Sequence, residues 1–293
     1  MTRIVNNCVA LVCLCLFWGQ SLRAADASHS EQIKWGNESV FNEEHNTLGL
    51  FSGVLGGQIV LAGGTSDDYS RWGRNAVCLS ENAGFALYED VLSKPLAYGA
   101  SITLSDGILC IGGRDSSQCY EDVFFVTMQQ GKLNVSEDWP PLPFPLSNAA
   151  GALLDNKVYL FGGRKSVSPS RLSDSFFVLD LSNKSRGWKE LPGYPGCVRE
   201  DAILVVQNNG VSPCLYLLGG QTETEEGLSS CLTDGYVYNP QLGKWSSLGS
   251  DFPKGICAAV ASGANHILLF QKEPEDTQHL MEIPYNYADS CQV

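Results

Sequence analysis

A unit of about fifty residues recurs along this chain of 293 residues, and it constrains the fold more than any other feature. Each unit has an apolar strand that ends in a glycine pair, a polar loop, and a second strand rich in aromatic residues. The glycine pairs are Gly63-Gly64, Gly112-Gly113, Gly162-Gly163 and Gly219-Gly220. Repeats of this length are typical of solenoids and propellers, in which copies of one supersecondary unit pack side by side.

The residues between the glycine pairs predict β-strands. Runs such as Val158-Tyr159-Leu160-Phe161 and Asp174-Ser175-Phe176-Phe177 are rich in β-branched and aromatic residues and lie between turn residues. Tryptophans close three of the units, at Trp139, Trp188 and Trp245. No stretch keeps a helical apolar period, so the sequence predicts an all-β protein.

This pattern resembles the kelch repeat, which implies a β-propeller built from four-stranded blades. Glycine pairs allow a backbone turn where a side chain would collide with the next blade, and tryptophan fills the gap between blades. Five blades are recognisable. The last, over residues 256–270, has Gln271-Lys272 in place of the glycines. A strand around Trp35 either closes this blade, leaving no free sheet edge, or lies in a loose leader.

The first 24 residues have the pattern of a secretory signal peptide. Met1-Thr2-Arg3 is followed by an apolar run over residues 8–18 and by small residues around Ala24. The run is shorter than a membrane-spanning helix needs, although an uncleaved anchor is the alternative. We therefore expect a signal peptide over 1–24, a propeller over 25–293, and a periplasmic or secreted protein.

Cysteine usage fits export. Eight cysteines lie beyond residue 24, and an even number in an exported chain suggests disulfides, with buried free thiols as the alternative. The formal net charge of −13 gives no basic patch for nucleic acid or for an anionic membrane surface. Neither class of partner is expected.

Two opening blades resemble one family in particular. The segment Leu48-Gly49-Leu50-Phe51-Ser52-Gly53-Val54 leads to the first glycine pair, and Ala97-Tyr98-Gly99-Ala100-Ser101 leads to the second. Both are similar to blades of the bacterial N-acetylneuraminate epimerases, the sialic acid mutarotases, in the order of the cyclically permuted branch. The resemblance implies a six-bladed isomerase that acts on a sugar acid and uses no metal or redox cofactor.

The resemblance also implies a catalytic residue. The family has a glutamate in a G-E-x-K-P-G-x-R-T pattern, and Glu273 stands at that position here. Lys272 replaces the preceding glycine, and His279 stands where the family has arginine. The alternative for Glu273 is a solvated acid in an acidic tail.

Binding of the substrate carboxylate requires a cation, preferably an arginine that donates two hydrogen bonds. Arg71, Arg114 and Arg164 lie in loops after glycine pairs, and Arg199 precedes an inner strand. We expect several of these to converge at one mouth of the channel, although each could be an ordinary surface charge. The four histidines have no metal-ligand spacing, so no metal site is expected.

These observations predict an exported mutarotase that interconverts the α- and β-anomers of N-acetylneuraminate. The replaced glycine, the replaced arginine and the missing blade favour the alternative, a non-catalytic kelch propeller that binds a glycan or a protein. The fold itself does not separate the two hypotheses.

Overall fold

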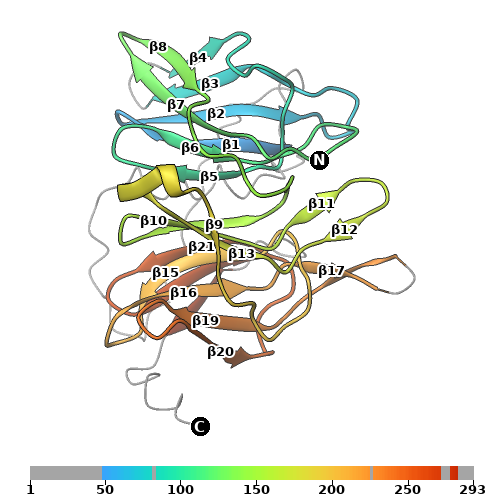
Figure 1. Cartoon of the computed structure of the whole chain (residues 1–293), viewed down its shortest axis with the longest axis vertical. Helices are drawn as coiled ribbons and strands as arrows, with labels where there is room; N and C mark the ends of the chain where they lie inside the picture. The colour runs from blue at the N-terminus through green and yellow to red at the C-terminus, as the bar shows by residue number, and fades with distance from the viewer. Residues whose placement is uncertain (1–47, 81–83, 225–226, 272–277, 283–293) are drawn as a thin grey trace.

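The computed structural model describes residues 48–80, 84–224, 227–271 and 278–282. These residues form four four-stranded antiparallel sheets and one three-stranded sheet (Figure 1). Each sheet is one blade, and the blades follow one another in chain order. The expected all-β kelch propeller is confirmed, and the five blades recognised in the sequence are all present among the described residues.

Within each blade the strands are ordered from the inside of the propeller outward, beginning with the first strand of the blade. Blade 1 consists of β1 (Leu48–Leu55), β2 (Gln58–Thr65), β3 (Ala76–Ser80) and β4 (Gly84–Tyr88). Blade 2 consists of β5 (Ala100–Thr103), β6 (Ile108–Ile111), β7 (Val123–Gln129) and β8 (Lys132–Ser136). Blade 3 consists of β9 (Ala150–Leu154), β10 (Lys157–Phe161), β13 (Phe176–Asp180) and β14 (Lys189–Glu190), with the 3-10 helix η1 (Leu181–Arg186) before its last strand.

Blades 3 and 4 each carry an extra hairpin. Blade 4 consists of β15 (Ile203–Asn208), β16 (Pro213–Leu218), β19 (Gly235–Asn239) and β20 (Lys244–Gly249). The hairpins are β11 (Arg164–Ser166) with β12 (Arg171–Leu172), and β17 (Gln221–Glu223) with β18 (Ser229–Cys231). Both begin directly after a glycine pair and project from the same end of the molecule (Figure 1).

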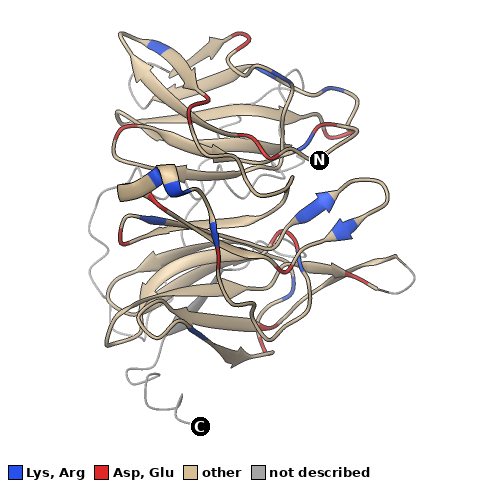
Figure 2. Ribbon diagram, viewed as in Figure 1, with Lys and Arg blue, Asp and Glu red and all other residues tan. Residues whose placement is uncertain are grey.

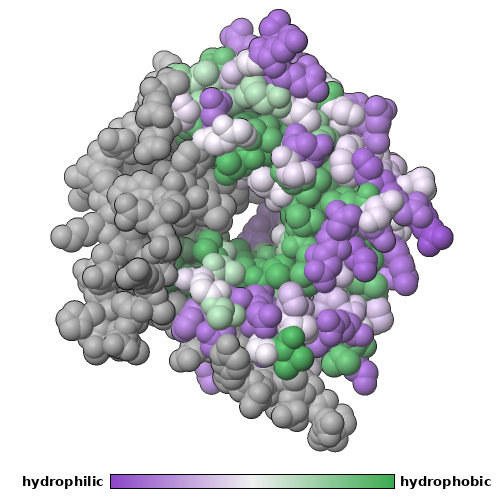
Figure 3. Space-filling model, turned by 90° about the vertical axis from the view of Figure 1, so that its left-hand side faces the viewer, coloured by the Kyte–Doolittle hydropathy of each residue, from purple (hydrophilic) through white to green (hydrophobic). Residues whose placement is uncertain are grey.

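Blade 5 consists of β21 (Ile256–Ser262), β22 (His266–Gln271) and β23 (Gln278–Glu282). The first strands β1, β5, β9, β15 and β21 contact one another in that order and form the inner wall. Seen from the left-hand side of Figure 1, the described residues curve around a central opening (Figure 3). The proposed signal peptide and Trp35 lie outside the described residues. No helix in the described ranges is long and apolar enough to cross a membrane.

The glycine pairs have the role that the sequence predicted. Gly112 has φ of 63°, and a Cβ atom there would lie 2.2 Å from the carbonyl oxygen of Leu146 in the next blade. Gly113 donates its N–H to the same carbonyl at 2.8 Å. Gly63 makes the same approach to Leu96 of blade 2. Glycine is therefore required because neighbouring blades meet backbone to backbone.

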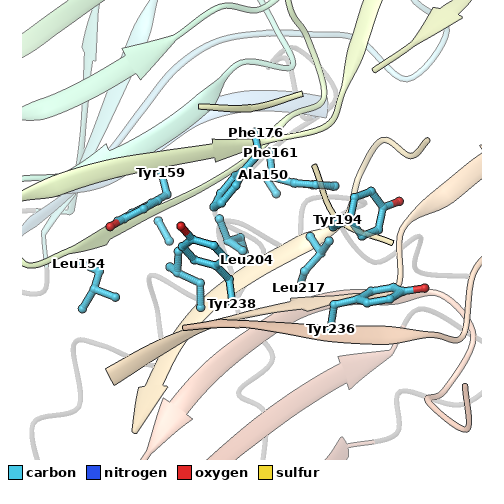
Figure 4. Packing of buried hydrophobic residues seen from close by; sticks show 13 residues of the cluster. Ala150, Leu154, Tyr159, Phe161, Phe176, Tyr194, Leu204, Leu217, Tyr236 and Tyr238 are labelled. Atoms are coloured by element: carbon cyan, nitrogen blue, oxygen red, sulfur yellow. The ribbon is translucent and has the colours of Figure 1, made fainter. Parts of the chain in front are cut away.

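Apolar side chains from neighbouring blades pack into four core clusters, one at each of the four successive interfaces from blade 1 to blade 5. Between blades 3 and 4, aromatic rings dominate, among them Tyr159, Phe176 and Tyr238 (Figure 4). Trp245 packs against this cluster, with its ring centroid 5.0 Å from that of Phe176. Trp188 joins blade 3 to blade 2 through a hydrogen bond to the Pro140 carbonyl. The predicted role of tryptophan between blades is confirmed.

The expectation of disulfides is contradicted for the cysteines that the structure describes. None of the seven described cysteines forms a disulfide with another described cysteine, and Cys291 lies outside the described ranges. Cys78, Cys110, Cys119 and Cys214 are buried. Burial raises the pKa of Cys78 to about 11, because a thiolate is poorly solvated in the core. These cysteines serve as small apolar core residues, which was the alternative interpretation.

Candidate functional site

A ring of left-handed residues marks the end of the propeller where the inner strands begin. Gly49, Tyr98, Asn148 and Asp201 each lie in or just before an inner strand and have φ between 52° and 64°. The N–H of Tyr98 donates to Gly49, that of Asn148 to Tyr98, and that of Asp201 to Asn148, at 2.7, 2.7 and 3.0 Å. These bonds join four blades at one rim, which we call the mouth.

A second layer of residues pairs with this ring. The residue after each glycine pair forms a two-way backbone bridge with the residue before the left-handed one: Arg114 with Ala97, Arg164 with Ser147, and Gln221 with Glu200. The repeat thus brings two side-chain positions from each of blades 2, 3 and 4 to the mouth. They enclose a cavity of about 230 Å³, lined by Tyr69, Tyr98, Arg114, Asn148, Arg164, Val167, Glu200, Asp201 and Gln221.

Arg114 is the cation of this cavity that no acid in the described part of the chain neutralises. Its guanidinium carbon lies 4.7 Å from the ring centroid of Tyr98 and 5.2 Å from that of Trp72. In the described ranges it forms no ion pair, and its buried Nε has no hydrogen-bond partner. Arg114 is thus held by cation–π contacts and keeps donors available to a ligand.

Arg164 lies in the same cavity, but its charge is neutralised. Its Nε donates to Glu200 at 2.9 Å, and its Nη2 contacts Glu200 and Glu223, the latter also at 2.9 Å. Ser170 accepts from Nη1, and its hydroxyl donates to Glu223 at 2.6 Å. The two hairpins of blades 3 and 4 are therefore joined through this guanidinium. Figure 2 shows the basic residues of β11 in blue on the hairpin of blade 3.

The acids of this network differ in their solvation. Burial raises the pKa of Glu200, and the hydrogen bond from Arg164 opposes this effect. The hydrogen bond from Ser170 lowers the pKa of the more exposed Glu223. The bidentate geometry with Arg164 favours the ionised form of Glu200, so this carboxylate acts chiefly as the partner of the arginine.

A polar cluster completes the cavity. Asp201 accepts from the Asn148 amide at 2.8 Å and from the Gln221 amide at 2.6 Å, one bond to each carboxylate oxygen. Tyr98 lies beside this cluster, and burial raises the pKa of its phenol, as does the neighbouring Tyr69 hydroxyl at 3.4 Å. The cavity thus combines a free guanidinium, amide and carboxylate groups, and aromatic faces.

Arg199 does not reach the mouth, contrary to the prediction. Its side chain is fully buried and donates to Asp234, to the Gly219 carbonyl and to the Tyr194 hydroxyl. It occupies the repeat position that holds Leu96 and Leu146 in blades 2 and 3, as their shared carbonyl contacts show. This position faces the core, and Arg199 has a structural role.

The other predicted site residues have different outcomes. Arg114 and Arg164 are brought together in the cavity, whereas Arg71 is exposed in a neighbouring loop and does not line it. His279 lies in β23, where its backbone pairs with Leu269. Glu273 lies outside the residues that the structure describes, so its assignment stays a prediction.

Sequence reasoning missed Tyr69, Tyr98, Asn148, Glu200 and Asp201. A signal for three of them was present, because Tyr98, Asn148 and Asp201 have the same place in successive repeats, just before an inner strand. Their left-handed conformation is only weakly indicated by residue type, because asparagine and aspartate are enriched in this region but most of them lie elsewhere.

The chain is similar in sequence to known proteins. The sequence model of the family described as N-acetylneuraminate epimerase matches residues 139–273. The N-acetylneuraminate epimerase of Yersinia pestis (strain Pestoides F) is 30% identical over 139 residues, 46% of this chain and 33% of that protein. This chain is similar to the N-acetylneuraminate epimerases. The enzyme of Haemophilus influenzae (strain PittEE) is 31% identical over 131 residues, 45% of this chain and 32% of its own.

A kelch domain-containing protein of Vibrio cholerae is also similar, at 30% identity over 141 residues, 47% of this chain and 36% of its own. The chain spans about one third of the length of the epimerases it matches. The family match includes Arg164, Glu200 and Asp201 and ends at Glu273, whereas Tyr69, Tyr98 and Arg114 lie before it. The epimerase similarity therefore covers one part of the cavity.

Proposed function

We propose that this protein is a sugar mutarotase that interconverts the α- and β-anomers of N-acetylneuraminate. The observation that carries the proposal is the guanidinium of Arg114, which forms no ion pair with any described residue, in a cavity lined mainly by aromatic and hydrogen-bonding groups. A sugar acid has a carboxylate that can pair with this guanidinium and hydroxyl groups that can bond to the polar lining. Similarity to proteins named N-acetylneuraminate epimerase supports the same substrate class.

Anomerisation needs two proton transfers. A base removes the proton of the anomeric hydroxyl, the bond from the anomeric carbon to the ring oxygen breaks, and an acid protonates that oxygen. The open-chain ketone rotates, and the reverse steps close the ring on the other face. The reaction needs no change of oxidation state.

Arg114 binds the substrate carboxylate in this proposal. A guanidinium presents two parallel donors to a carboxylate, and an aromatic environment limits competition from water. Arg164 serves another purpose, since Glu200 and Glu223 already occupy its donors. It joins the hairpins that border the cavity and holds Glu200 in place.

Glu273 is the proposed base, because of its position in the family pattern.

The amide and carboxylate cluster of Asn148, Asp201 and Gln221 offers both acceptors and donors to the sugar hydroxyls. Its neutral and acidic groups bind hydroxyls without attracting a second carboxylate.

The competing hypothesis is a propeller that binds a glycan or a protein without catalysis. A time course separates the two. α-N-acetylneuraminate is released by a sialidase in mildly acidic buffer, and proton NMR follows its approach to equilibrium with and without the protein. Acceleration that is lost in Glu273→Gln supports the mutarotase and its base. Acceleration that survives in Glu273→Gln keeps the function and discards this base, and no acceleration by folded protein leaves the binding propeller.

We also propose that the protein acts after export, in the periplasm or outside the cell. The support is the basic start, apolar run and small residues of the first 24 positions. Sequencing of the N-terminus of the protein recovered from the periplasmic fraction tests this, and cleavage between Ala24 and Ala27 is the expected result. A full-length cytoplasmic product would contradict it.

A further inference from the structure

The loop over residues 66–72 is stabilised by its own hydrogen bonds. Asp68 accepts from the Ser66 hydroxyl at 2.5 Å and from the N–H and hydroxyl of Ser70 at 3.1 and 2.8 Å. The Ser66 hydroxyl and N–H also pair with the backbone of Arg71. The serine hydrogen bonds, that of Ser66 first, lower the pKa of Asp68 to about 2, so the carboxylate stays ionised at neutral pH. The loop is thus held in one conformation.

This loop presents Tyr69 at the rim of the cavity. Tyr69 has φ of 59°, and its backbone N–H and carbonyl are bonded within the loop, to Ser66 and to the indole of Trp72. Its side chain takes no part in these bonds. The residue is 50% exposed, and its ring stacks on Tyr98 with a centroid distance of 6.5 Å and an interplanar angle of 18°. A strained backbone therefore holds a large aromatic ring half in solvent beside Arg114.

We propose that Tyr69 is a specificity-determining residue, on which the C–H face of a cyclic sugar acid stacks while Arg114 binds its carboxylate. This inference rests on the substrate class of the proposed function. The guanidinium of Arg114 already contacts Tyr98 and Trp72, so Tyr69 is the ring of this group that keeps an open face. Packing of sugar C–H groups on a rigid aromatic face gains dispersion and removes apolar surface from water.

Tyr69 selects for the closed ring in this arrangement. An open-chain acid offers a carboxylate to Arg114 but no continuous C–H face to Tyr69. The contact therefore contributes to substrate binding rather than to proton transfer, and its loss raises KM more than it lowers kcat.

The test uses the methyl α-glycoside of N-acetylneuraminate, whose ring cannot open, as a binding probe for the full chain. Isothermal titration compares the parent with Tyr69→Asn, Tyr69→Phe and Phe85→Ala. Asparagine tolerates the left-handed conformation, so it removes the ring without added backbone strain. Phe85, 47% exposed on β4, is a matched aromatic control away from the cavity.

We expect Tyr69→Asn to raise the Kd of the glycoside about tenfold, and Tyr69→Phe and Phe85→Ala to stay within about twofold of the parent. Equal binding by Tyr69→Asn and the parent overturns the inference and leaves the proposed function intact. Binding that depends on Tyr69 without any anomerisation keeps the inference and overturns the proposed function. If the folded parent does not bind the glycoside, both fall.

Discussion

The guanidinium of Arg199 is fully buried and donates to both carboxylate oxygens of Asp234, at 2.7 and 2.8 Å. The pair joins the start of blade 4 to the loop before β19. Blades 2 and 3 place Leu96 and Leu146 at the position of Arg199, so this ion pair replaces an apolar contact between blades.

Removal of Asp234 should destabilise the protein more than removal of Arg199. Asp234→Ala leaves a buried guanidinium without its counter-ion, and we expect a loss of about 3–5 kcal/mol in the free energy of unfolding. Arg199→Leu restores the residue of the other blades and leaves Asp234, which is 22% exposed and accepts from Tyr236, so about 1–2 kcal/mol is expected. Urea unfolding measures both, and a larger loss for Arg199→Leu would contradict this account.

The same pair predicts a dependence on pH. Partial burial raises the pKa of Asp234, but the hydrogen bonds and charge of Arg199 outweigh it, and the pKa is lowered overall. A carboxyl whose pKa is lower in the folded state stabilises the protein above its unfolded pKa of about 3.9, and this stability is lost as pH falls through the folded value. The difference in unfolding free energy between parent and Asp234→Asn therefore shrinks from pH 6 to pH 3. A constant difference over this range would exclude the linkage.

A glycine substitution tests the contact between blades. Gly112→Ala places a methyl group 2.2 Å from the Leu146 carbonyl and adds left-handed strain, whereas Gly131→Ala, with φ of 74° and no atom within 4 Å, adds only strain. We expect a loss of about 1 kcal/mol for Gly131→Ala and about 3 kcal/mol or more for Gly112→Ala. Thermal unfolding of both variants checks this, and equal losses would show that the carbonyl contact is unimportant.

The two cavity arginines differ in what they stabilise. Arg164→Met leaves the buried Glu200 without its partner, and because the site is partly open we expect a loss of about 2–3 kcal/mol. Arg114→Gln breaks no ion pair among the described residues, so its unfolding free energy stays within about 1 kcal/mol of the parent. Urea unfolding measures both losses. A larger loss for Arg114→Gln than for Arg164→Met would show that Arg114, rather than Arg164, holds the mouth together.

Much of the fold follows from the repeat, because a glycine pair, an inner strand and a tryptophan each have one place in a blade. The site follows only in part. Arg114 and Arg164 were predicted because they directly follow glycine pairs, the position that the bridges to Ala97 and Ser147 bring to the mouth.

Arg199 was assigned to the site by its charge, although alignment of the repeats places it with Leu96 and Leu146 in the core. Tyr69 could not be predicted from the repeat, because its place at the rim depends on hydrogen bonds within its own loop. The disulfides were predicted from the even number of cysteines and the export signal, but no two described cysteines are bonded to each other, and four of them lie in the core.

In the proposed function, the cavity at the mouth binds a sugar acid through Arg114 and speeds its anomerisation. The most direct test is the initial rate of decay of α-N-acetylneuraminate, followed by proton NMR, for the parent, Arg114→Gln and Lys157→Gln. Lys157 is exposed at the opposite end of β10 from the glycine pair and serves as the control for lost charge. We expect acceleration by the parent and by Lys157→Gln, and a kcat/KM at least about tenfold lower for Arg114→Gln. Absence of acceleration by the folded parent, or full activity of Arg114→Gln, would contradict it.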